Sequence, residues 1–179
     1  MQQTINEVFG SKVTVPGTGI LLNNTQAMFD PHPGNPNSVL PNKRVVSSMA
    51  PTIVSRDGKP FLGIGTPGGV RIFGSVMQAI MNVIDHGMTL QEAVEAPRLW
   101  TQGQDVELEH EFGEGPGAGM SGLGHPVVRV PNVAGGTNGI LIDHERGLMT
   151  GAACWRADGV PAGLSGGPAN SDARFNPLV

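Results

Sequence analysis

The sequence has one cysteine and no tyrosine, and six Phe and two Trp are its only aromatic residues. A single cysteine excludes an internal disulfide. No apolar run approaches the roughly 20 residues that a membrane-spanning helix needs. The formal net charge of −4, from 11 basic and 15 acidic residues, is too small to indicate nucleic acid or an anionic membrane as a partner. The opening MQQTINEVFG lacks the basic start and apolar run of a signal peptide, which leaves cytoplasm and periplasm both open.

Glycine is abundant, at 27 of 179 residues, which is about twice its usual share. The length suits a single domain over residues 1–179, and the Pro- and Gly-rich segments 29–43 and 112–125 are predicted to be irregular loops. Apolar residues recur at helical spacing between Arg71 and His86, which predicts an amphipathic helix. Thr89 and Glu92 match a capping box, so a second, short helix should run up to Pro97.

Strand signals flank these helices. They predict two short strands within residues 3–22, a hairpin over 51–65 with its turn at Asp57-Gly58, and further strands over 126–131 and 135–155. The order of elements predicts an α/β fold of the α+β kind, a sheet with helices layered on one face. Four apolar helix residues are predicted to lie in the core: Phe73, Met77, Ile80 and Ile84. The acidic segment ELEHEFGE, residues 107–114, is predicted to be a solvated loop.

The stretch FLGIGTPGGVRI, residues 61–72, places glycines directly before the first predicted helix. A Walker loop would end in Gly-Lys-Ser/Thr, whereas Gly69 is followed by Val70 and Arg71. A dinucleotide fingerprint fits as a string, but Pro67 interrupts it and no acidic residue ends a strand about 20 residues on. Two interpretations remain. The glycines form a tight structural turn, or their N–H groups at a helix start face a negative oxygen, as in an oxyanion hole.

Other polar residues are less specific. Ser47 and Ser48 are adjacent, and both can face one ligand only from a bend; as isolated features they are surface serines. Thr4 and Asn6 would share one face of a strand. The five histidines show no metal-ligand spacing with one another or with Cys154, so neither a metal nor a cofactor is predicted. Cys154 is predicted to be a core residue.

Five segments together carry a family resemblance: TINEVFGSKVTVPGTGILLNN, NKRVVSSMAPTIV, GTPGGVRI, AVEAPRLW and GGTNGI. In this order and spacing they resemble the small subunit of gamma-glutamyltransferases, from Thr4 to about Gly159. The resemblance implies part of a four-layer αββα sandwich, the N-terminal nucleophile hydrolase fold. It also implies a proenzyme that cleaves itself before a threonine, which then acts as the nucleophile. That threonine lies upstream of the position matching Thr4, so this chain lacks the nucleophile segment and is expected to be inactive alone.

The resemblance also implies site residues. Thr4 matches a threonine that hydrogen-bonds the nucleophile, and Asn6 matches a substrate-binding asparagine. Ser47 and Ser48 match the serines that hold the substrate carboxylate. Gly68 and Gly69 match the oxyanion hole.

One segment departs from the family pattern. Where the family has Asn-Asn-Gln-Met-Asp-Asp-Phe, this chain has NNTQAMF, with Thr25 in place of the Gln and Met28 in place of the second acid. In the family that acid pairs with the substrate's α-ammonium. The chain is therefore expected to act on an amide of a gamma-glutamyl or glutaryl (dicarboxylic monoamide) acyl group, together with a large subunit supplied by a separate chain or an upstream segment. The alternative is a non-catalytic truncated remnant that acts as a binding or structural domain.

Overall fold

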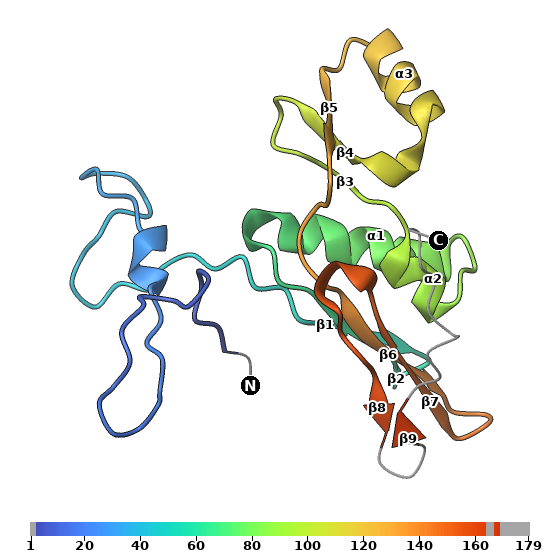
Figure 1. Ribbon diagram of the computed structural model, residues 1–179, viewed down its shortest axis with the longest axis horizontal. Helices are drawn as coiled ribbons and strands as arrows, with labels where there is room; N and C mark the ends of the chain where they lie inside the picture. The colour runs from blue at the N-terminus through green and yellow to red at the C-terminus, as the bar shows by residue number, and fades with distance from the viewer. Residues whose placement is uncertain (1–2, 164–166, 169–179) are drawn as a thin grey trace. The chain divides into compact units, whose positions relative to one another are not determined.

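The computed structural model describes residues 3–163 and 167–168, and it divides the chain into two units (Figure 1). The first unit is Met1–Ser48 and the second is Met49–Val179. The assignment of residues 1–179 to one domain stays a prediction.

The first unit has little regular structure. Its described residues form the 3₁₀ helix η1 (Thr25–Met28) and two isolated bridges, Thr14 with Leu21 and Asp30 with Ser38. The prediction of two strands over residues 3–22 is wrong. The N–H of Val15 donates to the Ile20 carbonyl at 2.8 Å and that of Leu22 to the Val13 carbonyl at 2.9 Å, but these bonds form a single bridge and no strand. Positive φ angles turn the chain too often for a strand, at Phe9, Gly10, Lys12, Gly17 and Gly19.

A four-stranded antiparallel sheet lies at the centre of the second unit, in the order β1-β2-β6-β7. Its strands are β1 (Thr52–Arg56), β2 (Lys59–Gly65), β6 (Asn138–Asp143) and β7 (Leu148–Ala153). The predicted hairpin over 51–65 is confirmed and turns at Asp57 and Gly58 with φ of 52° and 73°, and the strands predicted over 135–155 pair as a second hairpin. The hairpins join through β2 and β6, which bring residues far apart in the sequence to neighbouring positions.

Two helices cover one face of this sheet (Figure 1). They are α1 (Ile72–Ile84) and α2 (Leu90–Glu95), as predicted, and α2 begins at the predicted capping box of Thr89 and Glu92. The core lies between the helices and the sheet. Its members include Leu62 and Ile64 of β2, Val76 of α1, and Leu90 and Val94 of α2. The second unit thus supplies one helix layer on one sheet layer.

A smaller sheet holds β3 (Leu99–Thr101), β4 (Val106–Glu109) and β5 (Val127–Val130), with β4 antiparallel to β3 and parallel to β5. The remaining elements are short: η2 (Gly69–Arg71), η3 (His110–Phe112), η4 (Trp155–Ala157), β8 (Ala162–Gly163) and β9 (Gly167–Pro168). None of the helices in the described part of the chain has the length and apolar character needed to cross a bilayer.

The predicted irregular loop at 112–125 needs correction, because residues Glu114–Gly122 form helix α3 between β4 and β5. Pro116 lies in the first turn, where a missing N–H costs nothing. Gly117 is buried, and a Cβ there would lie 3.0 Å from Nη2 of Arg129, whose guanidinium also holds the Gly113 carbonyl before the helix. Gly117 therefore permits close packing of α3 on Arg129, which helix propensities alone do not reveal.

Helix α1 has a second apolar stripe that faces away from the core. Phe73, Met77 and Ile84 are 58%, 53% and 45% exposed, so their predicted place in the core is wrong, whereas Ile80 packs against the core as expected. Met81 continues the stripe. The opposite face of the main sheet is also apolar, because Ile53 and Ile140 are exposed there with Gly63 between them. Apolar surfaces of this kind mark contact sites on folded proteins.

The stripe predicts association of the 179-residue chain. We expect sedimentation to show concentration-dependent oligomers, and the double variant Met77→Gln/Ile84→Gln to shift the population toward monomer because two exposed apolar side chains are removed. Leu123→Gln is the matched control, since Leu123 is exposed after α3 and outside the stripe. A monomeric wild type, or equal effects of the two substitutions, would contradict the prediction.

Candidate active site

The glycine turn, residues 66–71, connects β2 to α1 through η2. Gly68 has a φ of 142°, and a Cβ there would lie 2.5 Å from the Cβ of Ala134, so packing requires glycine. Gly69 has a φ of 60°, and a Cβ there would meet nothing within 4 Å. The first N–H groups of a helix have no acceptor within it. Gly69 therefore combines a backbone that favours glycine with open space beside a helix start.

An ion pair fixes the end of this turn. Arg71 donates from Nε to Oε2 of Glu107 at 2.8 Å and from Nη2 to Oε1 at 2.5 Å. The hydrogen bonds from Arg71 lower the pKa of Glu107, and those to Glu107 raise the pKa of Arg71. A cation at a helix N-terminus is unfavourable for the helix dipole. Glu107 offsets that charge and ties the start of α1 to β4.

A second loop packs against the glycine turn. This 133–137 loop, VAGGT, donates from Gly135 N–H to the Pro67 carbonyl at 2.9 Å, and its Gly135 carbonyl accepts from Thr66 Oγ1 at 3.0 Å. A Cβ at Gly135 would lie 2.7 Å from Pro67 Cγ. The loop and the turn are therefore in backbone contact, and movement of one would displace the other.

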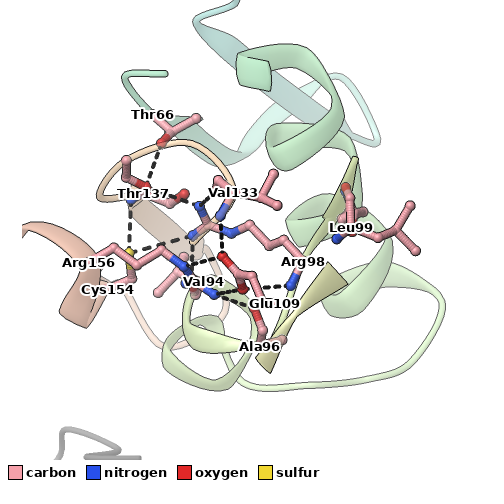
Figure 2. Close-up of polar contacts among 12 residues, drawn as sticks. Thr66, Val94, Ala96, Arg98, Leu99, Glu109, Val133, Thr137, Cys154 and Arg156 are labelled. Atoms are coloured by element: carbon pink, nitrogen blue, oxygen red, sulfur yellow. Dashed lines mark hydrogen bonds and ion pairs between the residues drawn. The ribbon is translucent and has the colours of Figure 1, made fainter. Parts of the chain in front are cut away.

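Behind the loop lies a buried cluster of two arginines and one glutamate (Figure 2). Arg156 donates from Nε to Oε1 of Glu109 at 2.8 Å and from Nη2 to Oε2, and both side chains have no exposed surface. Arg98, which is 2% exposed, directs its guanidinium to backbone carbonyls. Burial lowers the pKa of Arg98. Burial also opposes protonation of Arg156, but the hydrogen bond and charge of Glu109 outweigh it and raise that pKa.

Local sequence patterns did not predict this cluster. Glu107 and Glu109 lie within the segment predicted to be a solvated loop. That prediction is wrong for residues 107–109, which belong to β4: Glu107 pairs with Arg71 and Glu109 is fully buried, whereas His110, Glu111 and Glu114 are exposed. A signal was available, because Arg98 stands within the apolar run Pro97-Arg98-Leu99-Trp100. A charged residue in such a run points to a buried cation that needs acceptors.

Thr4 and Asn6 lie in the first unit, but they do not share a strand face, because Asn6 has a φ of 72°. Thr4 Oγ1 instead accepts the Asn6 N–H at 2.9 Å. The Asn6 side chain donates from Nδ2 to Oδ1 of Asn24 at 2.9 Å, and the same oxygen accepts the Glu7 N–H at 3.1 Å. Asn24 therefore fixes the orientation of the Asn6 amide.

Ser47 and Ser48 lie in an extended segment at the end of the first unit, Ser47 exposed and Ser48 half-buried. They precede β1 and belong to no helix or strand. Of the six predicted site residues, four thus lie in the first unit and Gly68 and Gly69 in the second. Their grouping into one site stays a prediction.

Met28 closes η1, and its carbonyl accepts from Asn37 Nδ2 at 2.7 Å. The nearest acid along the chain is Asp30, whose carboxylate serves its own loop. Oδ1 accepts from His32 N–H at 2.8 Å, and Oδ2 accepts from Asn35 Nδ2 at 2.6 Å. These bonds, with the His32 N–H as the largest cause, lower the pKa of Asp30.

Cys154 is a buried core residue, as predicted, at 1% exposure. Its Sγ accepts from the Thr137 N–H at 3.1 Å and from Arg98 Nη2 at 3.5 Å. Among the residues that the structure describes, no three His, Cys, Asp or Glu side chains lie close enough together to hold a metal ion.

Comparison with known proteins gives consistent matches. The family model for gamma-glutamyltranspeptidase matches residues 1–164. The acylase ACY 1 proenzyme of Pseudomonas sp. (strain SE83) is 53% identical over 173 residues, which cover 97% of this chain and 31% of that protein. The glutathione hydrolase proenzyme of Bacillus subtilis (strain 168) is 40% identical over 163 residues, which cover 90% of this chain and 28% of that protein. This chain thus spans about a third of the length of the curated relatives it matches.

The solved structure of gamma-glutamyltranspeptidase from Pseudomonas nitroreducens complexed with L-DON matches with a TM-score of 0.81 and 31% identity, over 92% of this chain and 92% of that one. The match confirms the predicted fold class, α/β as part of the αββα N-terminal nucleophile hydrolase sandwich. It also shows that the glycine turn and the 133–137 loop are set in a fold shared with such enzymes.

The Arg71–Glu107 pair makes stability at the turn depend on pH. Because the pKa of Glu107 is lowered in the folded protein, its charge stabilises the fold above the ordinary glutamate value of about 4.3, and this contribution is lost as the pH falls through the lowered value. Glu107→Gln should therefore lower Tm most near neutral pH and least in acid. Since Arg71 is 38% exposed, solvent screening limits the effect to about 1 kcal/mol or less. Thermal unfolding across the acid range tests this, with the exposed Glu145→Gln as control. A Tm difference that stays constant with pH would contradict it.

Proposed function

Because this chain belongs to the gamma-glutamyltranspeptidase family, we propose that it is the C-terminal, small-subunit part of an amide hydrolase or acyltransferase. The reaction would pass through an acyl-enzyme. A threonine hydroxyl attacks the amide carbonyl, the amine leaves, and water or a second amine takes the acyl group from the threonine. No metal or cofactor enters this scheme.

The glycine turn is the observation that carries the proposal. In the tetrahedral intermediate the former carbonyl oxygen becomes negative, and N–H groups about 3 Å away would stabilise it. The N–H groups of Gly68 and Gly69 stand at a helix start, and the open space beside Gly69 leaves room for the reacting group. The Arg71–Glu107 pair and the contact of Gly68 with the 133–137 loop support a turn that is rigid before substrate binds.

The nucleophilic threonine would come from polypeptide outside these 179 residues, since the relatives are named as proenzymes and are longer than this chain. Its own α-amino group, with an ordinary pKa near 8, can act as the base. Thr4 would hydrogen-bond that threonine, while Asn6, Ser47 and Ser48 would bind the substrate. The exposed stripe of α1 and the open face of the main sheet support a large-subunit partner that covers them.

The acyl group we propose is a dicarboxylic monoacyl group such as glutaryl. Met28 cannot pair with the α-ammonium of a gamma-glutamyl group, and burying that charge without a partner is costly. Asp30 already accepts three hydrogen bonds within its loop, which supports the same conclusion. Ser47, Ser48 and Asn6 can still hold a carboxylate through neutral hydrogen bonds. The identity of 53% to a protein named acylase, against 40% to one named glutathione hydrolase, also favours an acyl group other than gamma-glutamyl.

The test of the site uses a chimeric proenzyme in which this chain replaces the matching region of the Pseudomonas acylase ACY 1 proenzyme. Gly69→Ala should lower kcat by roughly a hundredfold and change KM little, because oxyanion donors act in the transition state. Alanine at φ 60° is strained by about 1–2 kcal/mol, and relief of that strain turns the N–H away.

Gly87→Ala is the matched control. Gly87 follows α1, has a φ of 66°, and a Cβ there would meet nothing within 4 Å, so the variant carries the same strain without touching the site. Both variants should melt earlier, but only Gly69→Ala should lose kcat. Equal kcat in the two variants would show that the turn is structural, and an inactive wild-type chimera would favour the non-catalytic alternative.

Substrate choice gives a second test. The chimera should prefer a glutaryl anilide to the gamma-glutamyl anilide by roughly tenfold or more in kcat/KM, at a pH where the amine is charged. Met28→Asp should shift this ratio toward gamma-glutamyl, because it restores a carboxylate for the ammonium. Met28→Asn should leave the ratio unchanged, because asparagine has the shape of aspartate but carries no charge. A wild-type preference for gamma-glutamyl would show that another acid holds the ammonium.

A further inference from the structure

Gly68 depends on the 133–137 loop for its position. The loop residue Ala134 stands where a Cβ on Gly68 would be, and Gly135 N–H holds the Pro67 carbonyl at 2.9 Å. Ala134 itself has a φ of 63°, an uncommon conformation for alanine that persists only where surrounding contacts enforce it. Val133 and Thr137 at the two ends of the loop are fully buried, but Ala134, Gly135 and Gly136 between them offer little side chain to pack.

The contacts that enforce the loop come from the buried cluster. Arg98 donates from Nη1 to the Val133 carbonyl at 3.3 Å and to the Gly135 carbonyl at 3.0 Å, on either side of Ala134. Glu109 Oε1 accepts the Val133 N–H at 2.6 Å. Figure 2 shows the guanidinium of Arg98 placed between the loop and the end of α2, whose Val94 carbonyl accepts from Nη2 at 2.8 Å.

The cluster is itself fixed. Glu109 Oε2 accepts the Arg98 N–H at 2.7 Å, and Arg156 donates to both oxygens of the same carboxylate. Buried ion pairs contribute little net stability, because desolvation offsets their attraction. What they do supply is geometry, since the planar fork of an arginine reaches several acceptors only in one orientation.

We infer that Arg98 is a positioning residue for the oxyanion turn: it sets the 133–137 loop through the carbonyls of Val133 and Gly135, and the loop sets Gly68. The catalytic consequence rests on the proposed function, whereas the structural coupling does not. Arg98 touches no reacting atom in this scheme. Lysine at the same position keeps the charge but loses the fork, so it should release the loop.

Amide exchange in the 179-residue chain tests the coupling directly. The Gly135 amide donates to the Pro67 carbonyl. In Arg98→Lys this amide should exchange roughly tenfold faster or more, because the charged guanidinium no longer holds the Gly135 carbonyl. The Asp85 amide, bonded to the Met81 carbonyl at 2.7 Å in α1, is the internal reference. Thr66→Val removes the other donor to the Gly135 carbonyl and should act in the same direction, which keeps the test valid if Arg98→Lys fails to fold.

Arg129→Lys is the matched control, because Arg129 also holds backbone carbonyls, those of Glu109 and Gly113, but none in the loop. Arg129→Lys should leave unchanged the ratio of the amide exchange rate at Gly135 to that at Asp85. In the chimeric proenzyme, Arg98→Lys should lower kcat per titrated active site by about tenfold or more with little change in KM.

An unchanged Gly135-to-Asp85 ratio in the Arg98 and Thr66 variants, or an equal change in Arg129→Lys, would overturn the inference. Faster exchange at Gly135 with an unchanged kcat would also overturn it, because the turn would then move without affecting the reaction. An inactive wild-type chimera would count against the proposed function alone, since the exchange measurement does not depend on activity.

Discussion

The second unit depends on one buried carboxylate. Glu109 accepts hydrogen bonds from the N–H groups of Arg98 and Val133 and from two nitrogens of Arg156, with no exposed surface. A buried carboxylate is tolerated only when its oxygens are satisfied, so these donors must stay in place for the fold to be stable. The donors come from the residue before β3, the 133–137 loop and η4. A single side chain therefore fixes three segments that are distant in sequence.

Contacts that start at Glu109 hold the candidate active-site turn in place. Glu109 and Arg98 hold the 133–137 loop, the loop contacts Pro67 and Gly68, and Arg71 ties the other end of the turn to Glu107. Glu107 and Glu109 stand two residues apart on β4, so one strand restrains the turn by two routes. Such restraint matters for an oxyanion site, because donors that are already in place need no reorganisation when charge develops.

Local patterns in the sequence predicted the elements that depend on local interactions. The Asp57-Gly58 hairpin, α1 and the Thr89–Glu92 capping box follow from turn chemistry, helical spacing and an N-cap, and all three are found. The family resemblance identified the fold and named Gly68 and Gly69. The burial of Glu109 could not be foreseen, because strand alternation places Glu107 and Glu109 on one face and only tertiary contacts distinguish them. The exposure of Phe73, Met77 and Ile84 was not predicted for a related reason. Helical spacing shows that a face of α1 is apolar, but not whether another part of this chain covers that face.

The glycines of the turn and of the 133–137 loop explain why the buried cluster consists of charged residues. The ends of the loop VAGGT are fixed by the buried side chains of Val133 and Thr137, but its middle, residues 134–136, has almost no side-chain surface. Backbone close approach demands this composition, since a Cβ at Gly68 or Gly135 would collide with Ala134 or Pro67. Apart from the buried side chains of Val133 and Thr137, the carbonyls and N–H groups are the features of the loop that a neighbour can hold. Arginine and glutamate are suited to that task, because a fork of donors and a pair of acceptor oxygens engage several backbone groups at once. The buried charges thus follow from the glycines, and the glycines at 68 and 135 from the close backbone contact between the turn and the loop.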